Sequence, residues 1–358
     1  MPSPLVTVII PVYNLAPYLE TTIQSLVGQT YPNTELLFVN DGSTDNSAEI
    51  LKAAAEKYPN IRSLHQENAG QGAARNNGLD NATGEFVLFL DGDDWLDPVT
   101  LERAVEAALK ENADIVCFGY KSVKKQADGK LEELYKFEYD PAVFHEDLVS
   151  CFLAENTVRK DAVNTATLGK LYKRSLIETH HIRFRQRIFE DSPFMLEAVY
   201  HATRLTCISG YFYYYLQRGT EGEASTMNSG FRADKVALFY QADQQMKSFL
   251  LSKGVWSRYR NDFSRYHNAR VIIYGGYFEL YRYSHAATKE AYRAFIKLLQ
   301  KHSADLGWER ASLFKTYRKR VPVLHIGLFL SRISPRLADR YFRTYEKKYA
   351  FDRPSSGN

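Results

Sequence analysis

Three carboxylates stand within four positions at the end of an apolar segment. The segment EFVLFL occupies residues 85 to 90, and Asp91, Asp93 and Asp94 follow it directly. Carboxylate oxygens are ligands that Mg²⁺ and Mn²⁺ accept, and an ion held in this way bridges the oxygens of a diphosphate. The alternate spacing of Asp91 and Asp93 lets both side chains point into one cavity. Without further evidence, a second interpretation of this turn is possible. It could be a solvent-exposed acidic turn that caps a helix beginning near Pro98.

A second polar turn, VNDGSTDNS, follows another apolar run at residues 39 to 47. Asp41 at the end of that run has the chemistry to accept a hydrogen bond from the imide N–H of a base. Gly42 lets the backbone turn tightly, and the polar residues after it supply helix caps. A strand-to-helix turn without a ligand is the alternative.

The segment NAGQGAARNNGL, residues 68 to 79, is a glycine-bearing loop that runs into a helix. Gly70 and Gly72 permit close approach of the backbone to a ligand. Arg75, one turn into the helix, has the reach for a base carbonyl or a phosphate. The segment matches neither the G-x-x-x-x-G-K-[ST] pattern nor a G-x-G-x-x-G motif after the first strand, which excludes P-loop and dinucleotide-binding interpretations.

These polar segments need a scaffold that brings them together, and the first 120 residues predict one. Apolar runs of strand length alternate with helical patterns, and the strands are expected at residues 5–10, 35–40, 61–65, 85–90 and 114–119. Apolar stripes at helical spacing are formed by Leu19, Ile23, Leu26 and Val27, and again by Leu101, Val105, Ala108 and Leu109. Such alternation predicts an α/β fold with a mainly parallel sheet covered on both faces. Ligands then bind at the carboxyl ends of the strands, where all three polar segments lie.

The rest of the chain changes character. Residues 121 to 226 mix helix and strand signals, and residues 227 to 358 are mainly helical. The aromatic strand CISGYFYYYLQR, at 207–218, contributes tyrosines that either stack on sugar rings or fill a core. Arg218 and the GTEGEAST segment after it form either a lid over a diphosphate or an ordinary surface loop.

Composition narrows the class of protein. The chain has 358 residues, of which 45% are hydrophobic, and three cysteines too scattered for a disulfide framework or a zinc site. We expect a protein of a reducing compartment, without a secretory signal or a run of 18 apolar residues. The longest apolar candidate, residues 321 to 331, is too short to span a bilayer as a helix. Cytoplasmic localisation follows as an expectation, with the inner face of the membrane as a second setting.

Taken together, the motifs resemble glycosyltransferase family 2, whose inverting enzymes have the GT-A fold and use sugar nucleotides. The resemblance rests on VTVIIPVYNLAPYLETTIQSLVGQTY, ELLFVNDGSTDNS, QENAGQGAARNNGL and GEFVLFLDGDDWLDP, in this order. It is dense from residue 5 to about 120 and thinner through GKLYKRSLI and FEDSPF to residue 226. It implies a GT-A catalytic domain over 1–226, with a nucleotide-binding half at 1–120 and an acceptor-binding half at 121–226, followed by a helical region.

The resemblance also implies roles for individual residues. On the donor side it places Pro11, Tyr13, Asn14, Asp41, Asn68, Gly70, Arg75, Asp91, Gly92 and Asp93. Asp41 would read the base, most often uracil, and Arg75 with the 68–70 loop would close over it. Asp91 would contact the ribose or sugar, while Asp93, with Asp91 beside it, would bind Mn²⁺ or Mg²⁺ on the diphosphate. The acceptor side would contain Glu190, Lys170 and Arg218.

The catalytic base is implied by the same resemblance to be Asp191, in FEDSPF. It would take the proton of an acceptor hydroxyl while the metal holds the departing nucleotide, and a single displacement inverts the anomeric configuration. The motif alone leaves a helix cap as the alternative for Asp191.

The expected partners follow from this reading and from the end of the chain. They are a nucleotide-sugar donor, preferably UDP-linked, and a saccharide or lipid-linked saccharide acceptor of a surface polysaccharide. Residues 309 to 358 hold twelve Lys and Arg against four Asp and Glu among aliphatic and aromatic residues, a pattern typical of contact with anionic lipid. Packing on the protein itself or on a second copy is the alternative. Nucleic acid is not expected as a partner, because no nucleic-acid-binding motif accompanies the charge.

Two other functions are weighed against this one. A non-catalytic sugar-nucleotide-binding or scaffold subunit would share the fold, although such a protein would be expected to lose some of Asp41, Asp91, Asp93 and Asp191. A nucleotidylyltransferase would need a glycine- and arginine-rich phosphate loop after the first strand, where this chain has PVYN.

Overall fold

The computed structural model describes residues 3–126, 128–144, 146–154, 163–218 and 233–270. Two compact units make up the chain. The first contains Met1–Phe152 and Val163–Arg218, and the second contains Leu153–Ala162 and Gly219–Asn358. The predicted domain boundary after residue 226, the GTEGEAST segment and the basic tail lie outside the described residues. Membrane contact and dimerisation through that tail therefore stay predictions.

The centre of the first unit is a parallel sheet in the order β3-β2-β1-β4. Its strands are β1 (Val6–Val12), β2 (Thr34–Asp41), β3 (Ile61–Gln66) and β4 (Phe86–Phe89). Every residue of β1, β2 and β4 is buried, as expected of parallel strands that are covered on both faces. The predicted strands and their parallel arrangement are confirmed.

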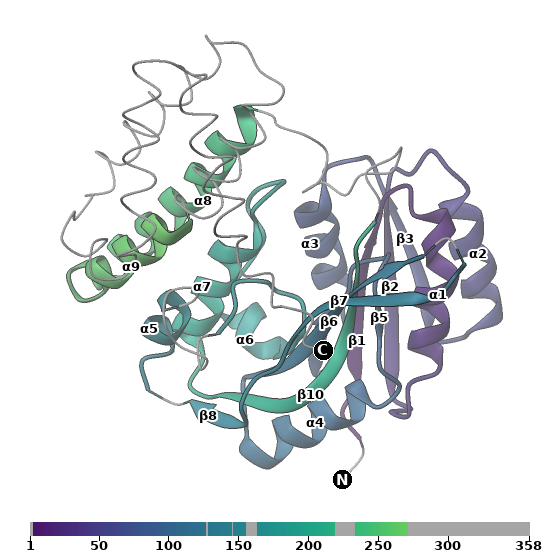
Figure 1. The fold of residues 1–358 in the computed structure, drawn as a ribbon, viewed down its shortest axis with the longest axis horizontal. Coiled ribbons are helices and arrows are strands. Elements are labelled where there is room, and N and C mark those ends of the chain that lie inside the picture. Colours follow the sequence, from purple (N-terminus) through teal and green to yellow (C-terminus); the bar gives the residue numbers. More distant parts are fainter. Residues whose placement is uncertain (1–2, 127, 145, 155–162, 219–232, 271–358) are drawn as a thin grey trace. The chain divides into compact units, whose positions relative to one another are not determined.

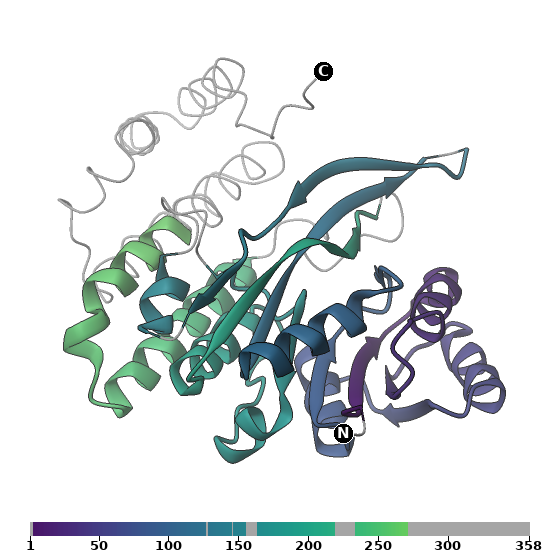
Figure 2. The ribbon, with the colours of Figure 1, turned by 90° about the horizontal axis from the view of Figure 1, so that it is seen from below.

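Beyond β4 the sheet becomes mixed. It continues through β9 (Lys170–Lys173), β6 (Ile115–Lys125), β10 (Leu205–Leu216) and β5 (Trp95–Leu96). Strand β9 runs antiparallel to both neighbours, whereas β10 is parallel to β6. Strands β7 (Leu131–Phe137) and β8 (Ala142–Phe144) pair with β6 and β10, and β6 and β7 form a long ribbon in Figure 2.

Helices cover both faces of the sheet (Figure 1). One face carries α1 (Ala16–Val27), α2 (Ser47–Lys57) and α4 (Thr100–Glu111), and the other carries α3 (Gln71–Asn81) and α7 (Asp191–His201). The shorter helices are α5 (Leu148–Leu153) and α6 (Arg174–Thr179). Alternate residues of β1, such as Val8 and Ile10, pack with the α1 and α4 stripes in one hydrophobic core. The α4 stripe is wrong at one position, because Leu109 is 54% exposed and Ala104 is buried instead.

The described part of the second unit consists of α8 (Ala233–Ser252) and α9 (Trp256–Arg270). Their apolar side chains, including Met246, Leu250 and Phe263, are buried. A buried Asp243 carboxylate is bonded to Nδ1 of His267. Among the described residues, none of the helices has the length and apolar character needed to cross a membrane.

Candidate active site

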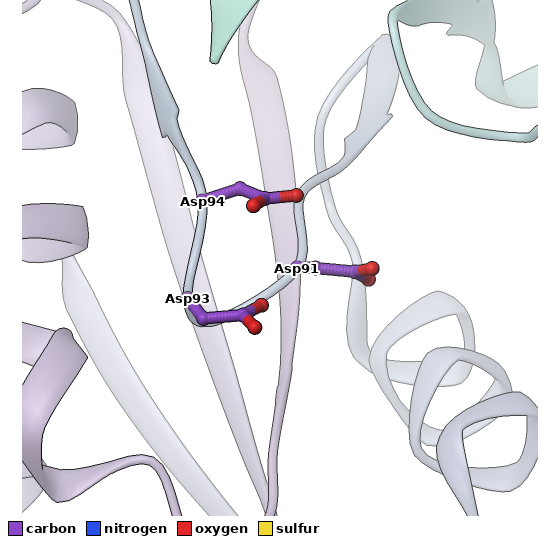
Figure 3. A group of neighbouring side chains, drawn as sticks. All are labelled: Asp91, Asp93 and Asp94. Atoms are coloured by element: carbon purple, nitrogen blue, oxygen red, sulfur yellow. The ribbon is translucent and has the colours of Figure 1, made fainter. Parts of the chain in front are cut away.

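The acidic turn lies at the carboxyl end of β4. In Figure 3 the side chains of Asp93 and Asp94 point across the turn toward the limb that carries Asp91, whose own side chain points away from the turn. One carboxylate oxygen from each of Asp91, Asp93 and Asp94 lies within 4.8 Å of the other two. The Thr22 hydroxyl on α1 donates to the carbonyls of Gly92 and Asp94, at 3.0 and 2.8 Å. A β-carbon on Gly92 would lie 3.0 Å from the Pro11 carbonyl oxygen, so the turn packs closely against the end of β1.

The three carboxylates differ in environment. Asp94 is completely buried and accepts hydrogen bonds from the Tyr213 hydroxyl, at 2.5 Å, and from the Leu216 amide, at 2.8 Å. Burial, and then the charges of Asp93 and Asp91, raise the pKa of Asp94 well above its ordinary value. Burial, followed by the charge of Asp91, also raises the pKa of Asp93 to about 6, against the opposing effect of Arg218.

This donor set fits a hard divalent cation. Asp91 and Asp93 are the two more accessible members, while both oxygens of Asp94 already accept hydrogen bonds inside the protein. Asp91 receives its two internal hydrogen bonds on Oδ1, from Gln71 and Arg75. Asp91 and Asp93 are therefore the residues that would hold Mn²⁺ or Mg²⁺, with Asp94 as a buried support.

Arg75 connects the acidic turn to the start of α7. The side chain comes from α3 and is 1% exposed. Nη2 lies 2.9 Å from Oδ1 of Asp91, and Nη1 lies 2.8 Å from Oε1 of Glu190 and 2.9 Å from Oδ1 of Asp191. Burial alone would lower the Arg75 pKa, but the three carboxylates raise it overall, so the guanidinium stays charged. Arg75 was predicted to contact a base or a phosphate. Such a contact would have to form while the guanidinium keeps its three carboxylate partners.

The start of α7 carries the predicted base. Oδ1 of Asp191 accepts hydrogen bonds from Arg75 and from the Thr167 hydroxyl, at 2.9 and 2.8 Å. The helix has no side-chain cap at Glu190, and Asp191 is its first residue, so these contacts favour a site role over the cap. Burial, and then the charge of Asp191, raise the pKa of Glu190 to about 8. Phe189 precedes the pair with φ of +61°, a left-handed conformation that is strained for a bulky side chain.

Asp41 fixes the loop that was predicted to close over a base. Its carboxylate accepts hydrogen bonds from the Ala69 and Gly70 amides, both at 2.8 Å, and from Gln66 Nε2. The Asn68 side chain donates to the Asp41 carbonyl at 3.0 Å. The sequence predicted that Asp41 and the 68–70 loop lie together. The structure shows in addition that hydrogen bonds to Asp41 hold this loop.

Gly70 has φ of +93°, and a β-carbon there would collide with Cγ of Arg187. Arg187 also donates to Oδ1 of Asn68, so its side chain covers the loop.

The residues after β1 lie at the same edge of the sheet. Tyr13 is 49% exposed, which leaves its ring available to a ligand, whereas Pro11 is buried within the strand. Asn14 has a left-handed backbone, and its Oδ1 accepts the Thr44 amide at 2.8 Å. The amide of Asn14 donates to Ser43 Oγ, so the first and second turns are tied together.

The acceptor-side residues occupy different places. Lys170 is 0% exposed, and its Nζ donates to Oδ1 of Asn164 and to the Ala166 carbonyl, at 3.0 and 2.6 Å. The predicted acceptor contact would require this side chain to leave the interior, so the geometry assigns it to the support of a loop. Arg218 instead lies at the acidic turn, with Nε 2.8 Å from Oδ2 of Asp93.

Sequence reasoning missed several residues of the site. Thr167 and Arg187 belong to no recognised motif, and nothing in their local sequence marks them. Tyr213 was one of the tyrosines left between sugar stacking and the core; it is buried, with its hydroxyl on Asp94. Tyr214 stacks on Trp95, with ring centroids 5.5 Å apart.

Known glycosyltransferases are similar to this chain in sequence. Residues 7–180 match the model of Glycosyl transferase family 2. The cholesterol galactosyltransferase of Borreliella burgdorferi is 30% identical over 263 residues, which are 73% of this chain and 72% of that protein. The protein EpsH of Bacillus subtilis is 33% identical over 226 residues, which are 60% of this chain and 61% of EpsH.

The fold has a solved counterpart in Staphylococcus aureus TarS 1–349 in complex with UDP-GlcNAc. The alignment has a TM-score of 0.68 and 22% identity, and covers 96% of this chain and 91% of that one. This similarity confirms the predicted GT-A fold. On the family model and the Borreliella relative, the chain belongs to glycosyl transferase family 2, the family and enzyme class that its motifs predicted.

Proposed function

We propose that this chain transfers a sugar from a nucleotide sugar, preferably a UDP-sugar, to a hydroxyl of a saccharide or lipid-linked saccharide, with inversion at the anomeric carbon. The observation that carries the proposal is the position of Arg75. One buried guanidinium lies 2.9 Å from a carboxylate of the acidic turn and 2.9 Å from Asp191. A metal-binding turn and a candidate base are thereby held on the two sides of one site.

The donor side of the proposal rests on the edge of the parallel sheet. Turns after β1, β2 and β4, together with the loop before α3, meet where parallel sheets bind ligands. The proposed nucleotide contacts are Pro11, Tyr13, Asn14, Asp41, Asn68, Gly70, Arg75, Asp91, Gly92 and Asp93. The structural counterpart TarS was crystallised with UDP and with UDP-GlcNAc, which supports UDP as the first nucleotide to test.

The leaving group needs positive charge, and the acidic turn is suited to supply it. A divalent cation, when bound, neutralises the charge that builds on the departing nucleoside diphosphate. Asp91 and Asp93 would hold this ion. The pKa of Asp93 is raised to about 6, so its carboxylate offers a full negative charge to the ion only when the pH rises above that value.

The acceptor side needs a base, and Asp191 has the required exposure. Its side chain is 29% exposed, and both described hydrogen bonds to it fall on Oδ1. Oδ2 is thus the oxygen available to take the proton of an acceptor hydroxyl, a step that contributes about 10²- to 10⁴-fold in rate. A single displacement on the face opposite the nucleotide converts an α-linked donor into a β-glycoside.

The class of acceptor is proposed from the relatives. TarS is named as a poly(ribitol-phosphate) β-N-acetylglucosaminyltransferase, and the Borreliella relative acts on cholesterol by name. Surface polymers and lipid-linked saccharides are therefore the acceptors to test, at the inner face of the cell membrane.

The test is a screen of UDP-sugars for release of UDP, with Mn²⁺ or with EDTA, and with or without a membrane extract as the source of acceptor. GDP-sugars serve as the matched control. We expect turnover of at least one UDP-sugar that needs the metal and rises with the extract. Tight binding of UDP without turnover of any nucleotide sugar would overturn the proposal and favour the non-catalytic subunit.

A further inference from the structure

We propose that Thr167 and Arg75 are positioning residues for Asp191: together they hold one oxygen of its carboxylate so that the other faces the acceptor. The inference deepens the proposed function, because it rests on Asp191 being the base. It assigns a role to a threonine that no motif marks.

The contacts converge on a single atom. Thr167 Oγ1 lies 2.8 Å and Arg75 Nη1 lies 2.9 Å from Oδ1 of Asp191. Thr167 comes from the loop before β9, and Arg75 comes from α3. Both donors are buried, whereas the Asp191 side chain is 29% exposed. Oδ1 of the carboxylate is thus held by two elements, while the two described contacts leave Oδ2 unused.

Fixing one oxygen matters because a carboxylate by itself turns easily. The terminal torsion of an aspartate is broad, so a single contact leaves a range of orientations. Two donors from different directions narrow that range. A base acts only when its oxygen comes within about 2.6 to 3.2 Å of the proton donor, and loss of alignment lowers the rate without weakening the binding of the substrate.

Thr167 is itself held in place by buried polar groups. The Tyr172 hydroxyl on β9 donates to the Thr167 carbonyl at 3.0 Å. Lys170 Nζ donates to the Ala166 carbonyl and to Asn164 Oδ1, which pins the loop just before Thr167. The complete burial of Lys170 and Tyr172 in the acceptor half is explained if their function is to present this threonine.

A substitution at Thr167 tests the positioning of Asp191 without changing the other contacts of the site. Arg75 also holds Asp91 and Glu190, so a change there disturbs the acidic turn and the charge balance together. The Thr167 hydroxyl has its described hydrogen bond to Asp191 only. Removal of that hydroxyl should leave the nucleotide contacts unchanged.

The experiment compares three variants of Thr167. Thr167→Val removes the hydroxyl and keeps the volume of the side chain, Thr167→Ala removes the hydroxyl and part of the volume, and Thr167→Ser keeps the hydroxyl. Single-turnover release of UDP is measured with UDP-GlcNAc, or with the UDP-sugar that the wild type turns over fastest. Affinity for UDP and the thermal midpoint are measured alongside. We expect the rate to fall about tenfold in the Val and Ala variants, with UDP affinity and donor KM within twofold, and to recover to within threefold in the Ser variant.

Several outcomes would overturn the inference. Wild-type rates in either Thr167→Val or Thr167→Ala would show that the hydroxyl does not orient the base. Equal losses in the Ser variant would point to packing alone. A wild-type rate in Arg75→Met, which has no N–H donor in its side chain, would remove the second donor from the proposed role. Asp191→Asn distinguishes the two proposals: if it turns over normally, the assigned base is wrong, and if it is inactive while the Thr167 variants are normal, only the positioning role fails.

Discussion

Nε of Arg218 lies 2.8 Å from Oδ2 of Asp93, so the acidic turn carries its own counter-ion. The N–H is not aligned for a hydrogen bond, and the guanidinium carbon lies 5.6 Å from the centre of the Tyr18 ring. The contact is therefore an ion pair rather than a hydrogen bond. A divalent cation on Asp93 would compete with Arg218 for the charge of this carboxylate, and the arginine would lie close to a diphosphate bound there.

This competition predicts that Arg218→Gln binds Mn²⁺ more tightly than the wild type when no nucleotide is present. The expected gain is about threefold to tenfold, the size of the effect of one opposing charge roughly 6 to 12 Å from the ion at a dielectric constant near that of water. Calorimetric titration at pH 8 measures it, with Arg204→Gln as the control, because Arg204 bonds to the Glu111 carbonyl instead. Unchanged or weaker binding in Arg218→Gln would contradict the competition.

Glu190 predicts a dependence of stability on pH. Its native pKa of about 8 lies above the value in an unfolded chain, so between about pH 4.5 and 8 the folded protein holds a proton that the unfolded chain has released. The contribution of Glu190 to the free energy of unfolding is therefore largest at low pH and is lost as pH rises through this window. In Glu190→Gln, the free energy of unfolding should therefore fall less over this range of pH.

Urea unfolding at pH 5 and pH 8.5 tests this dependence. At pH 8.5 we expect Glu190→Gln to be more stable than the wild type by roughly 1 to 3 kcal/mol, and at pH 5 to be similar. A mutant that is less stable by the same amount at both pH values would show that the proton on Glu190 is not the cause.

The left-handed backbone of Phe189 should cost stability, and two variants of this residue can measure that cost. Phe189→Ala and Phe189→Gly both remove the ring, but only glycine relieves the left-handed conformation at φ of +61°. The larger entropy of glycine in the unfolded chain offsets part of the gain. We expect the Gly variant to be more stable than the Ala variant by about 0.5 to 1 kcal/mol, measured by thermal unfolding. The opposite order would mean that this residue does not store strain.

Asp41 predicts the protection of two amides. Its carboxylate accepts from the Ala69 and Gly70 amides, so Asp41→Asn, which places an amide donor next to other donors, should release the loop. We expect hydrogen exchange at Ala69 and Gly70 to accelerate at least about tenfold, in line with the loss of a charged hydrogen bond. Affinity for UDP should fall with it. Unchanged exchange at both amides would show that the loop is held by other contacts.

The sequence predicts the first half of the fold well because its signals are local. Strands such as residues 85–90 are continuous apolar runs between turn residues, and the structure contains all five predicted strands. The error at Leu109 arises because helical spacing does not reveal where a helix stops touching the core. The antiparallel β9 was not predicted, since its pairing with β4 and β6 depends on segments far along the chain.

The site shows the same division. The motifs around Asp41, Asp91 and Asp191 are recognisable in the sequence, and the fold brings the residues of the acidic turn and the base to one guanidinium. Two of the three partners of Arg75, Glu190 and Asp191, lie 115 and 116 positions away from it. Tyr213, whose hydroxyl donates to Asp94, lies 119 positions away from that aspartate. Thr167 reaches Asp191 from a loop whose sequence has no signature, so only the folded arrangement shows it.

The most direct test of the account is the single-turnover rate of sugar transfer in Asp191→Asn, measured beside its affinity for UDP in the presence of Mn²⁺. If Asp191 takes the proton while Asp91 and Asp93 hold the ion on the diphosphate, the rate should fall by about 10²- to 10⁴-fold and UDP affinity should stay within about twofold of the wild type. A variant that transfers sugar at the wild-type rate would contradict the central claim.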